Sequence, residues 1–497
     1  MTQKIQLQEA FKLALSMVLF YWLALTMDWD LPKFGALAIV IISLSTTGAS
    51  LNKGVMRVVG TGLGALAGFV LLSWFSQSSL GMLLATAAWL VFVGYFLQTA
   101  RSGDTWFNAG FLAVAVWSSS YMKVDTAFHF ATTRFLETAA GVLIFTLVSA
   151  LLWPRNSGPA LQQQGQAIWQ DMQKLFNSYR QQLSTGAIDA ETADLRTRLA
   201  GEHQQLLATL DAAYADTPTV GAKKRSWEIL RIKLRAFGSA QELWRESIND
   251  CRELPLDELL PGLTVALDIL TQRLKRGRML WEDQKTDIIE DDFDDTTLLK
   301  EIHLQVDKPA CNALSHFQQA ALMNFVIQLQ ALDQNSRNLL QTLRVLANLE
   351  ADNSLPAHTR PGDLYQPSFW NPERLLRAVF PAACWVVGYA FWFYVEPPMM
   401  GAAFGLMMVM APANLFGLLI VLLLSMFITV APVYMLLMPS LDSGFGLLAL
   451  IFIYTMVFGY LGGRSPILKM GPLAMFVMMV DINNQQVYSF ILLVTAG

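Results

Sequence analysis

The most constraining feature of this sequence is that two long apolar blocks flank one polar stretch, residues 155–374. The chain is 54% hydrophobic and only 15% charged, and most of the charged residues lie in that stretch. Apolar blocks of this length bury their side chains most readily in a lipid bilayer, where about 20 apolar residues form one helical span. We therefore predict an integral membrane protein with one polar domain between two membrane blocks.

The first block predicts six membrane-spanning helices, separated by short polar breaks. These spans are expected at residues 10–27, 34–49, 58–75, 80–97, 106–121 and 135–153. No small-residue cleavage pattern follows the first span, so we interpret it as a retained helix and not as a signal peptide.

The second block predicts five spans and the beginning of a sixth. They are expected at residues 375–394, 399–410, 415–437, 447–461 and 468–480, with the sixth starting at Val487. Since the sixth span is cut short at Gly497, we expect a complete chain to continue past this residue.

The polar stretch carries apolar side chains at three- and four-residue spacing, which is typical of amphipathic helices in a bundle. Its helices are expected at residues 161–183, 191–216, 225–250, 256–281 and 306–349. The predicted domains are a first transmembrane half (1–154), a helical domain (155–373) and a second transmembrane half (374–497). Basic residues beside the first spans gather on one side: Lys4, Lys12, Lys53, Arg57, Arg101 and Arg155. The positive-inside rule therefore predicts that the amino terminus and the helical domain are cytoplasmic.

The two apolar blocks resemble each other, which indicates an internal repeat. Leu31-Pro32-Lys33-Phe34-Gly35-Ala36 is matched by Pro397-Pro398-Met399-Met400-Gly401-Ala402, and Gly94-Tyr95-Phe96 by Gly459-Tyr460-Leu461. An even number of spans in the first block lets both halves enter the membrane in the same direction. The predicted fold is all-α: a polytopic helical membrane protein with two parallel repeats of about six spans, related by a pseudo-twofold axis along the membrane normal and joined by a cytoplasmic helical bundle.

The composition excludes several function classes. The net charge is −4 and no long basic run is present, so we expect no nucleic-acid partner. The three cysteines show no CxxC spacing and no accompanying histidine pattern, so we expect no metal and no cofactor. The sequence also lacks a nucleophile elbow and a zincin motif, and we do not expect an enzyme.

A basic, glycine-rich segment follows the second span. We interpret Lys53 and Arg57 as a cytoplasmic turn that attracts anions and serves as a gate. Gly60, Gly64 and Gly68 recur every four residues and form a smooth face for helix packing. A phosphate-binding loop is the competing interpretation; however, no strand precedes the glycines and no Gly-Lys-Ser/Thr follows them, so we favour packing.

Interruptions at matched positions in the second span of each half predict the substrate site. The first half carries Ser45, Thr46 and Thr47 there, and the second half carries Asn414 after a break at Pro412. These side chains and the freed backbone groups are candidates for lining a shared cavity. Helix ends and cytoplasmic turns are the alternative interpretation.

Charged residues in or beside apolar spans are the second kind of candidate, because a charge held in hydrocarbon costs several kcal/mol. Arg134 and Glu137 lie three residues apart at the start of the sixth span, so Arg134 is a candidate for binding a carboxylate and Glu137 for proton coupling. A structural ion pair is the alternative. Asp104 and Asp481 are further proton-coupling candidates, for which simple turn residues are the alternative.

Two motifs and the architecture carry a family resemblance. The motifs are Lys53-Gly54-x-x-Arg57-x-x-Gly60-Thr61 and Arg134-x-x-Glu137-x-x-x-Gly141, the second leading to Trp153-Pro154. With a second membrane half after a helical domain, the chain resembles the fusaric acid resistance family of aromatic acid exporters over nearly its whole length. The resemblance implies a bacterial inner-membrane exporter of aromatic or other hydrophobic carboxylic acids, driven by the proton gradient. It also implies a periplasmic adaptor (membrane fusion) protein and an outer-membrane channel as partners.

Three functions are therefore carried forward. The first is secondary active export of organic anions across the lipid bilayer, which the parallel repeats and the lack of an ATP site favour. The second is a passive organic-anion channel, because plant malate channels have a distantly similar layout. The third is a non-transporting membrane scaffold, whose helical domain recruits partners. A homo-oligomer is a candidate assembly for each.

Overall fold

The computed structural model describes residues 3–29, 32–43, 46–98, 103–120, 126–186, 191–282, 295–350, 371–395, 424–441, 443–463 and 465–479. Of the part described, 87% is helical and none is strand, so the all-α prediction is confirmed for it. The chain divides into two compact units. The first, called the membrane unit here, comprises Met1–Arg155 and Ser368–Gly497; the second, the bundle unit, is Asn156–Pro367.

The membrane unit contains the long apolar helices. Its first half forms α1 (Gln3–Thr26), α2 (Lys33–Ile42), α3 (Thr47–Phe75), α4 (Ser79–Leu97), α5 (Gly103–Ser120) and α6 (Ala127–Leu151). Its second half forms α16 (Pro372–Val395), a short apolar helix made of the π-helical segments η3 (Met426–Val430) and η4 (Val433–Leu437) and the 3₁₀ segment η5 (Met438–Ser440), then α19 (Gly444–Leu461) and α20 (Pro466–Met479). Among the described residues, five helices are long and apolar enough to cross a membrane: α1, α3, α4, α6 and α19. The expected spans at 399–410 and after Val487 lie outside the described residues.

Three sequence expectations in the first half are wrong. The span expected at 34–49 is divided between α2, which ends at Ile42, and α3, which begins at Thr47. Residues 52–57 are not a turn, because α3 starts at Thr47 and runs through them. Thr46 caps this helix by accepting a hydrogen bond from the Ala49 amide at 3.3 Å, so the helix begins about three turns before the apolar window. α6 likewise starts at Ala127, so Arg134 and Glu137 lie inside the helix and not at its beginning.

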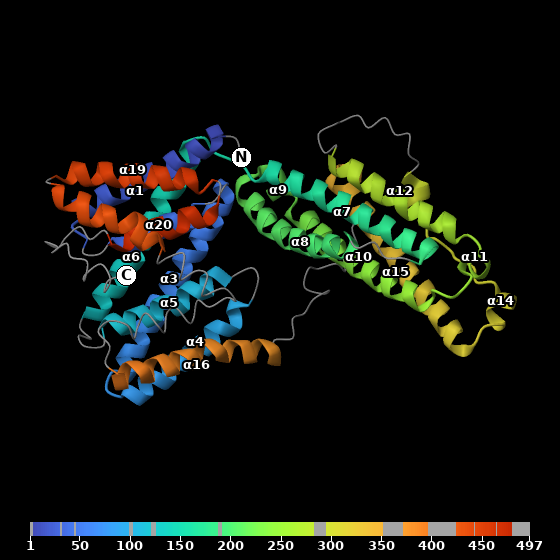
Figure 1. The fold of residues 1–497 in the computed structure, drawn as a ribbon, viewed down its shortest axis with the longest axis horizontal. Coiled ribbons are helices and arrows are strands. Elements are labelled where there is room, and N and C mark those ends of the chain that lie inside the picture. The colour runs from blue at the N-terminus through green and yellow to red at the C-terminus, as the bar shows by residue number, and fades with distance from the viewer. Residues whose placement is uncertain are drawn as a thin grey trace. The chain divides into compact units, whose positions relative to one another are not determined.

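Helices from the two halves pack against each other in a reciprocal way (Figure 1). The first helix of one half, α1, packs on α19, and the first helix of the other half, α16, packs on α4. Each contact uses a glycine: a Cβ on Gly459 would lie 3.2 Å from the Ala10 Cα, and one on Gly94 would lie 3.2 Å from the Ala378 Cα. These glycines come from the two sequence segments that match each other.

The helices α4 and α19 also begin in the same way. The Ser78 hydroxyl accepts a hydrogen bond from the Gly81 amide at 3.1 Å, and the Ser443 hydroxyl accepts one from the Gly446 amide at 3.2 Å. The same serine cap therefore starts the corresponding helix in each half.

The bundle unit consists of amphipathic helices around an aromatic core. Its helices are α7 (Gly158–Thr185), α8 (Glu191–Asp216), α9 (Pro218–Ala222), α10 (Lys224–Asp250), α11 (Leu256–Leu259), α12 (Leu263–Glu282), α13 (Asp295–Leu298), α14 (Lys308–Asn312) and α15 (His316–Leu346). The expected helix 256–281 is broken at Gly262, whose φ is 98°, and 306–349 is broken where Ser315 forms a capping box. In the core, the Trp244 ring stacks on Phe176 with centroids 5.5 Å apart.

One buried ion pair ties the bundle together. The Arg273 guanidinium donates to the Asp333 carboxylate at 2.5 Å and to the carbonyls of Leu298 and Lys300 at 2.5 and 2.7 Å. The side chains of Arg273 and Asp333 are only 1% and 4% exposed. This pair therefore joins α12 to α15 and fixes the chain around α13.

Candidate functional site

The candidate site forms where α2 crosses α6. Gly35 and Gly141 lie at this crossing, and a Cβ on Gly141 would lie 2.4 Å from the Gly35 carbonyl oxygen. A Cβ on Gly35 would likewise lie 2.4 Å from the Glu137 carbonyl oxygen. Only glycine lets the two backbones approach so closely, and this approach carries the neighbouring Phe34 toward Arg134.

At this crossing Arg134 and Glu137 form a buried ion pair. The Arg134 Nη1 donates to the Glu137 Oε2 at 2.7 Å, and the residues are 2% and 0% exposed. The Arg134 guanidinium also lies over two aromatic rings, 4.2 Å from the Phe34 centroid and 4.6 Å from the Phe130 centroid. The predicted pair is thus found together, inside a helix long and apolar enough to cross a membrane.

This environment makes the stability of the pair depend on a close anion beside the guanidinium. Removing two charges from water costs several kcal/mol for each ion, and the pair is stable only while the guanidinium keeps a close anion. The planar guanidinium can bind a carboxylate through two parallel hydrogen bonds. Phe34 and Phe130 lie against the guanidinium, and the Glu137 carboxylate meets it at Nη1.

A second group of charges lies on α3 and α5. Lys53 Nζ is 3.8 Å from the Asp104 Oδ2, and the charge of Asp104 also acts on Arg57, which is 9% exposed. The structure therefore brings both gate candidates to one proton-coupling candidate. Gly54, the neighbour of Lys53, contacts Val142 of α6, eight residues beyond Arg134.

Thr46 and Thr47 lie further still from Arg134. Thr46 caps α3, while the Thr47 amide donates to the Arg155 carbonyl at 3.0 Å and its hydroxyl contacts the Ser149 carbonyl at 3.5 Å. The structure thus places both threonines at the end of α6 opposite to Arg134. Ser45, Asn414 and Asp481 lie outside the described residues.

The three glycines of α3 face α5. A Cβ on Gly60 would lie 2.2 Å from the Thr105 carbonyl oxygen, and one on Gly64 would lie 2.7 Å from the Ala109 carbonyl oxygen. A Cβ on Gly68 would lie 2.8 Å from the Val116 Cβ. Side chains at these positions would force the two helices apart.

The sequence interpretation missed several buried or aromatic residues. Lys12 was assigned only to the set of inner positive charges, but it is 1% exposed and donates to Glu9 and to the Trp153 carbonyl, both at 2.9 Å. The position of Lys12 inside the expected span 10–27 could have indicated that this side chain is buried. Phe130 precedes Arg134 by one helical turn and could also have been found from that spacing, whereas Phe34 comes from another helix.

Within the residues that the structure describes, no cluster of three or more His, Cys, Asp or Glu side chains is arranged to hold a metal ion. Apolar helices with an ion pair buried inside them define a multi-pass helical membrane protein. The chain belongs to the fusaric acid resistance protein family, whose profile matches residues 6–497. This confirms the resemblance drawn from the sequence motifs.

Individual relatives match a shorter part of the chain. The p-hydroxybenzoic acid efflux pump subunit AaeB of Escherichia coli strain K12 is 24% identical over 158 residues, which is 30% of this chain and 24% of that protein. The AaeB proteins of Escherichia coli O1:K1 / APEC and Shigella boydii serotype 18 are each 23% identical over 158 residues, with the same coverage. The matched part thus spans about a quarter of the length of these relatives. The names of the family and of the relatives point to membrane transport rather than to an enzyme.

Proposed function

We propose that this protein is a secondary active exporter of aromatic or other hydrophobic carboxylic acids in the bacterial inner membrane, driven by the proton gradient. The observation that carries the proposal is the Arg134–Glu137 pair, 2% and 0% exposed inside α6. The names of the family and of the AaeB relatives supply the direction and the substrate class.

In this proposal Arg134 binds the substrate carboxylate and Glu137 carries the proton. While Glu137 is ionised it occupies the guanidinium, at 2.7 Å. On the cytoplasmic side the substrate carboxylate displaces the ionised Glu137 carboxylate from Arg134. After the substrate has left to the periplasm, Glu137 takes up a periplasmic proton, and loss of this proton to the cytoplasm restores the internal pair. Proton and substrate thus occupy the site in alternation, which couples inward proton movement to outward substrate movement.

The start of α2 supports anion binding at the same place. This helix begins at Lys33 and has only 10 residues, and its second residue, Phe34, contacts Arg134. A helix amino terminus carries a partial positive charge and favours a nearby anion, and short helices of this kind form substrate sites in many transporters.

The remaining candidates are proposed to serve the cytoplasmic entrance. Lys53 and Arg57 attract the anion and form the gate, and Asp104, 3.8 Å from Lys53, modulates it and is a second proton carrier. Polar residues of the interrupted spans are proposed to line the approach to this entrance: Ser45, Thr46, Thr47 and Asn414. Asp481 is proposed as a proton carrier on the opposite side.

The repeat, the orientation and the partners are proposed with this function. The reciprocal contacts of α1 with α19 and of α16 with α4 support two parallel repeats related by a pseudo-twofold axis. The amino terminus and the bundle unit are cytoplasmic in this proposal. A periplasmic adaptor protein, an outer-membrane channel and a homo-oligomer are the proposed assembly.

The test is accumulation of aromatic carboxylates in cells that express the chain, measured with and without an uncoupler. Lower accumulation that the uncoupler abolishes is the expected result. Efflux that persists after the proton gradient has collapsed would favour a passive channel, and accumulation equal to that of cells lacking the chain would favour a scaffold.

A further inference from the structure

We propose that the rings of Phe34, Phe107 and Phe111 form a subsite that binds the aromatic ring of the substrate and selects aromatic over saturated carboxylic acids. This inference rests on the proposed export function and adds the residues that set its specificity. It is carried by a continuous set of ring contacts that ends at Arg134.

The rings come from two helices and follow one another in space. Phe107 and Phe111 lie one turn apart on α5, with centroids 6.4 Å apart and planes inclined by 22°. The Phe111 centroid lies 6.4 Å from that of Phe34 on α2, with the planes inclined by 53°. The Phe34 ring then lies 4.2 Å from the Arg134 guanidinium on α6.

The set of three rings begins close to the charged group formed by Lys53, Arg57 and Asp104. Phe107 follows Asp104 by three residues on α5, which places both on one face of the helix. Asp104 is the residue that Lys53 approaches to 3.8 Å. The rings therefore connect the proposed cytoplasmic gate to the proposed carboxylate site.

The burial of these rings differs from that of packing residues in the same unit. Phe34, Phe107 and Phe111 are each partly exposed, whereas Phe20 and Phe145 of the neighbouring helices are 0% and 1% exposed. Ala109 and Ala113, on α5 beside them, are both 0% exposed. The three phenylalanines are thus less buried than these packing residues.

The chemistry of an aromatic carboxylate matches this arrangement. Its ring can stack offset or edge-to-face on a phenylalanine at the centroid distances that aromatic pairs prefer, about 4.5–7 Å. Its carboxylate can then reach the guanidinium that Phe34 already contacts. A saturated ring of the same size fills the space but lacks the quadrupole that favours these geometries.

The experiment compares benzoate with cyclohexanecarboxylate, which have the same charge and carbon number and differ in aromaticity. The full chain is reconstituted in proteoliposomes and the KM for each acid is measured. Phe34→Leu and Phe111→Leu are expected to raise the KM for benzoate by about 3- to 10-fold, since an aromatic pair contributes that much, and to change the other KM less than about twofold. Phe34→Tyr and Phe111→Tyr, which keep the ring, are expected to restore the discrimination.

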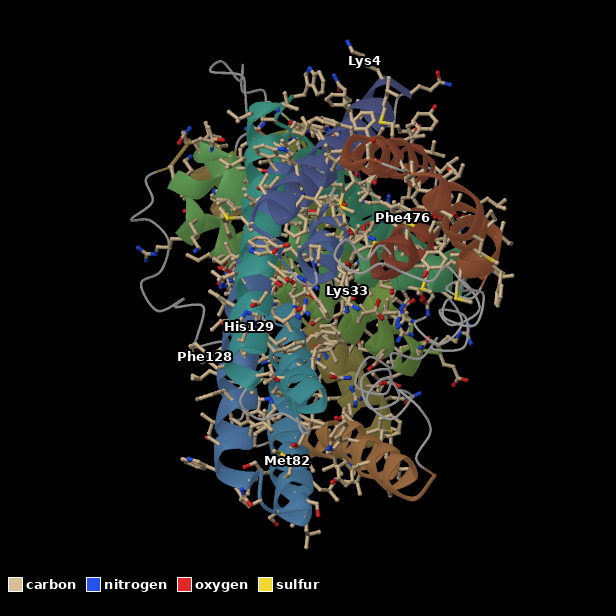
Figure 2. All side chains as sticks on the ribbon, turned by 90° about the vertical axis from the view of Figure 1, so that its left-hand side faces the viewer. Lys4, Lys33, Met82, Phe128, His129 and Phe476 are labelled. Atoms are coloured by element: carbon tan, nitrogen blue, oxygen red, sulfur yellow. The ribbon has the colours of Figure 1, made fainter. Side chains whose placement is uncertain are left out.

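The control is Phe128→Leu, because Phe128 lies on the same α6 helix as Arg134 but is 64% exposed and contacts Phe69 (Figure 2). It should leave both KM values unchanged. Equal effects on both acids, or none, in the variants of Phe34 and Phe111 would overturn the subsite while leaving export intact. Wild-type protein that moves neither acid would overturn the export function and the subsite together.

Discussion

Replacing one member of the Arg134–Glu137 pair by an apolar residue should destabilise the protein more than replacing both. Both residues are almost fully buried, and their side chains meet at 2.7 Å. Breaking a buried ion pair from one side costs about 3–5 kcal/mol, because the other charge stays in an apolar environment.

We therefore expect Arg134→Met to lower the unfolding free energy by about 3–5 kcal/mol. Glu137→Gln keeps a hydrogen-bonding oxygen beside Arg134 and should cost about 1–3 kcal/mol. The double variant Arg134→Met/Glu137→Leu leaves no charge at the site and should cost less than about 2 kcal/mol.

The assay is graded SDS denaturation of the purified chain in mixed micelles, followed by tryptophan fluorescence, with transport measured in parallel. All three variants should lose transport of the carboxylate, whatever their stability. A double variant that is destabilised by the sum of Arg134→Met and Glu137→Leu measured singly would refute the reasoning, because two independent side chains would then account for the data.

Three further predictions concern packing, the bundle core and pH. Gly64→Ala should destabilise the membrane unit by about 1–3 kcal/mol in SDS denaturation, because its Cβ would lie 2.7 Å from a backbone carbonyl oxygen. The control Gly62→Ala, on the same helix, meets only a movable ring at 3.2 Å and should be nearly neutral. Arg273→Met should lower the unfolding free energy by about 3–5 kcal/mol in thermal or urea unfolding. The control Arg180→Met breaks a partly exposed 2.7 Å ion pair and should lower it by less than about 1 kcal/mol. Similar losses of unfolding free energy in both variants would contradict the role of burial. Burial and the nearby Arg235 charge hold the pKa of His203 below its ordinary value of 6.5. The folded chain therefore binds fewer protons than the unfolded chain, and the unfolding free energy should fall as the pH drops below about 6.5. In melting experiments, His203→Gln should flatten this dependence between about pH 7 and 5.

The sequence was most informative where the physical signal is local. Hydrophobic windows located the apolar helices, and the three-residue spacing of Arg134 and Glu137 predicted that they share a helix face. The same method misplaced the start of α6, because a window of mean hydropathy treats two charges as a break even when they neutralise each other. It also missed the start of α3, where Thr46 caps a helix through polar residues.

Contacts between distant segments could not be predicted in this way. Phe34 reaches Arg134 only because Gly35 and Gly141 let α2 and α6 approach closely. Nothing in the sequence around either glycine indicates which helix it packs against. Lys12 was counted with the inner positive charges, but the fold buries it against the Trp153 carbonyl. The bundle helices broke where Gly262 adopts a positive φ and where Ser315 caps α15, two local signals that the long amphipathic pattern masked.

The central claim is that proton movement drives carboxylate movement through Arg134. Its most direct test uses purified full-length protein in proteoliposomes, with benzoate flux measured under an imposed pH gradient and without one, for the wild type and for Arg134→Lys. The account predicts that only the wild type moves benzoate beyond the passive level of protein-free vesicles, and only with the gradient, because lysine keeps the charge but cannot bind the carboxylate through a planar fork. Equal wild-type flux with and without the gradient, or unchanged accumulation by Arg134→Lys, would contradict it.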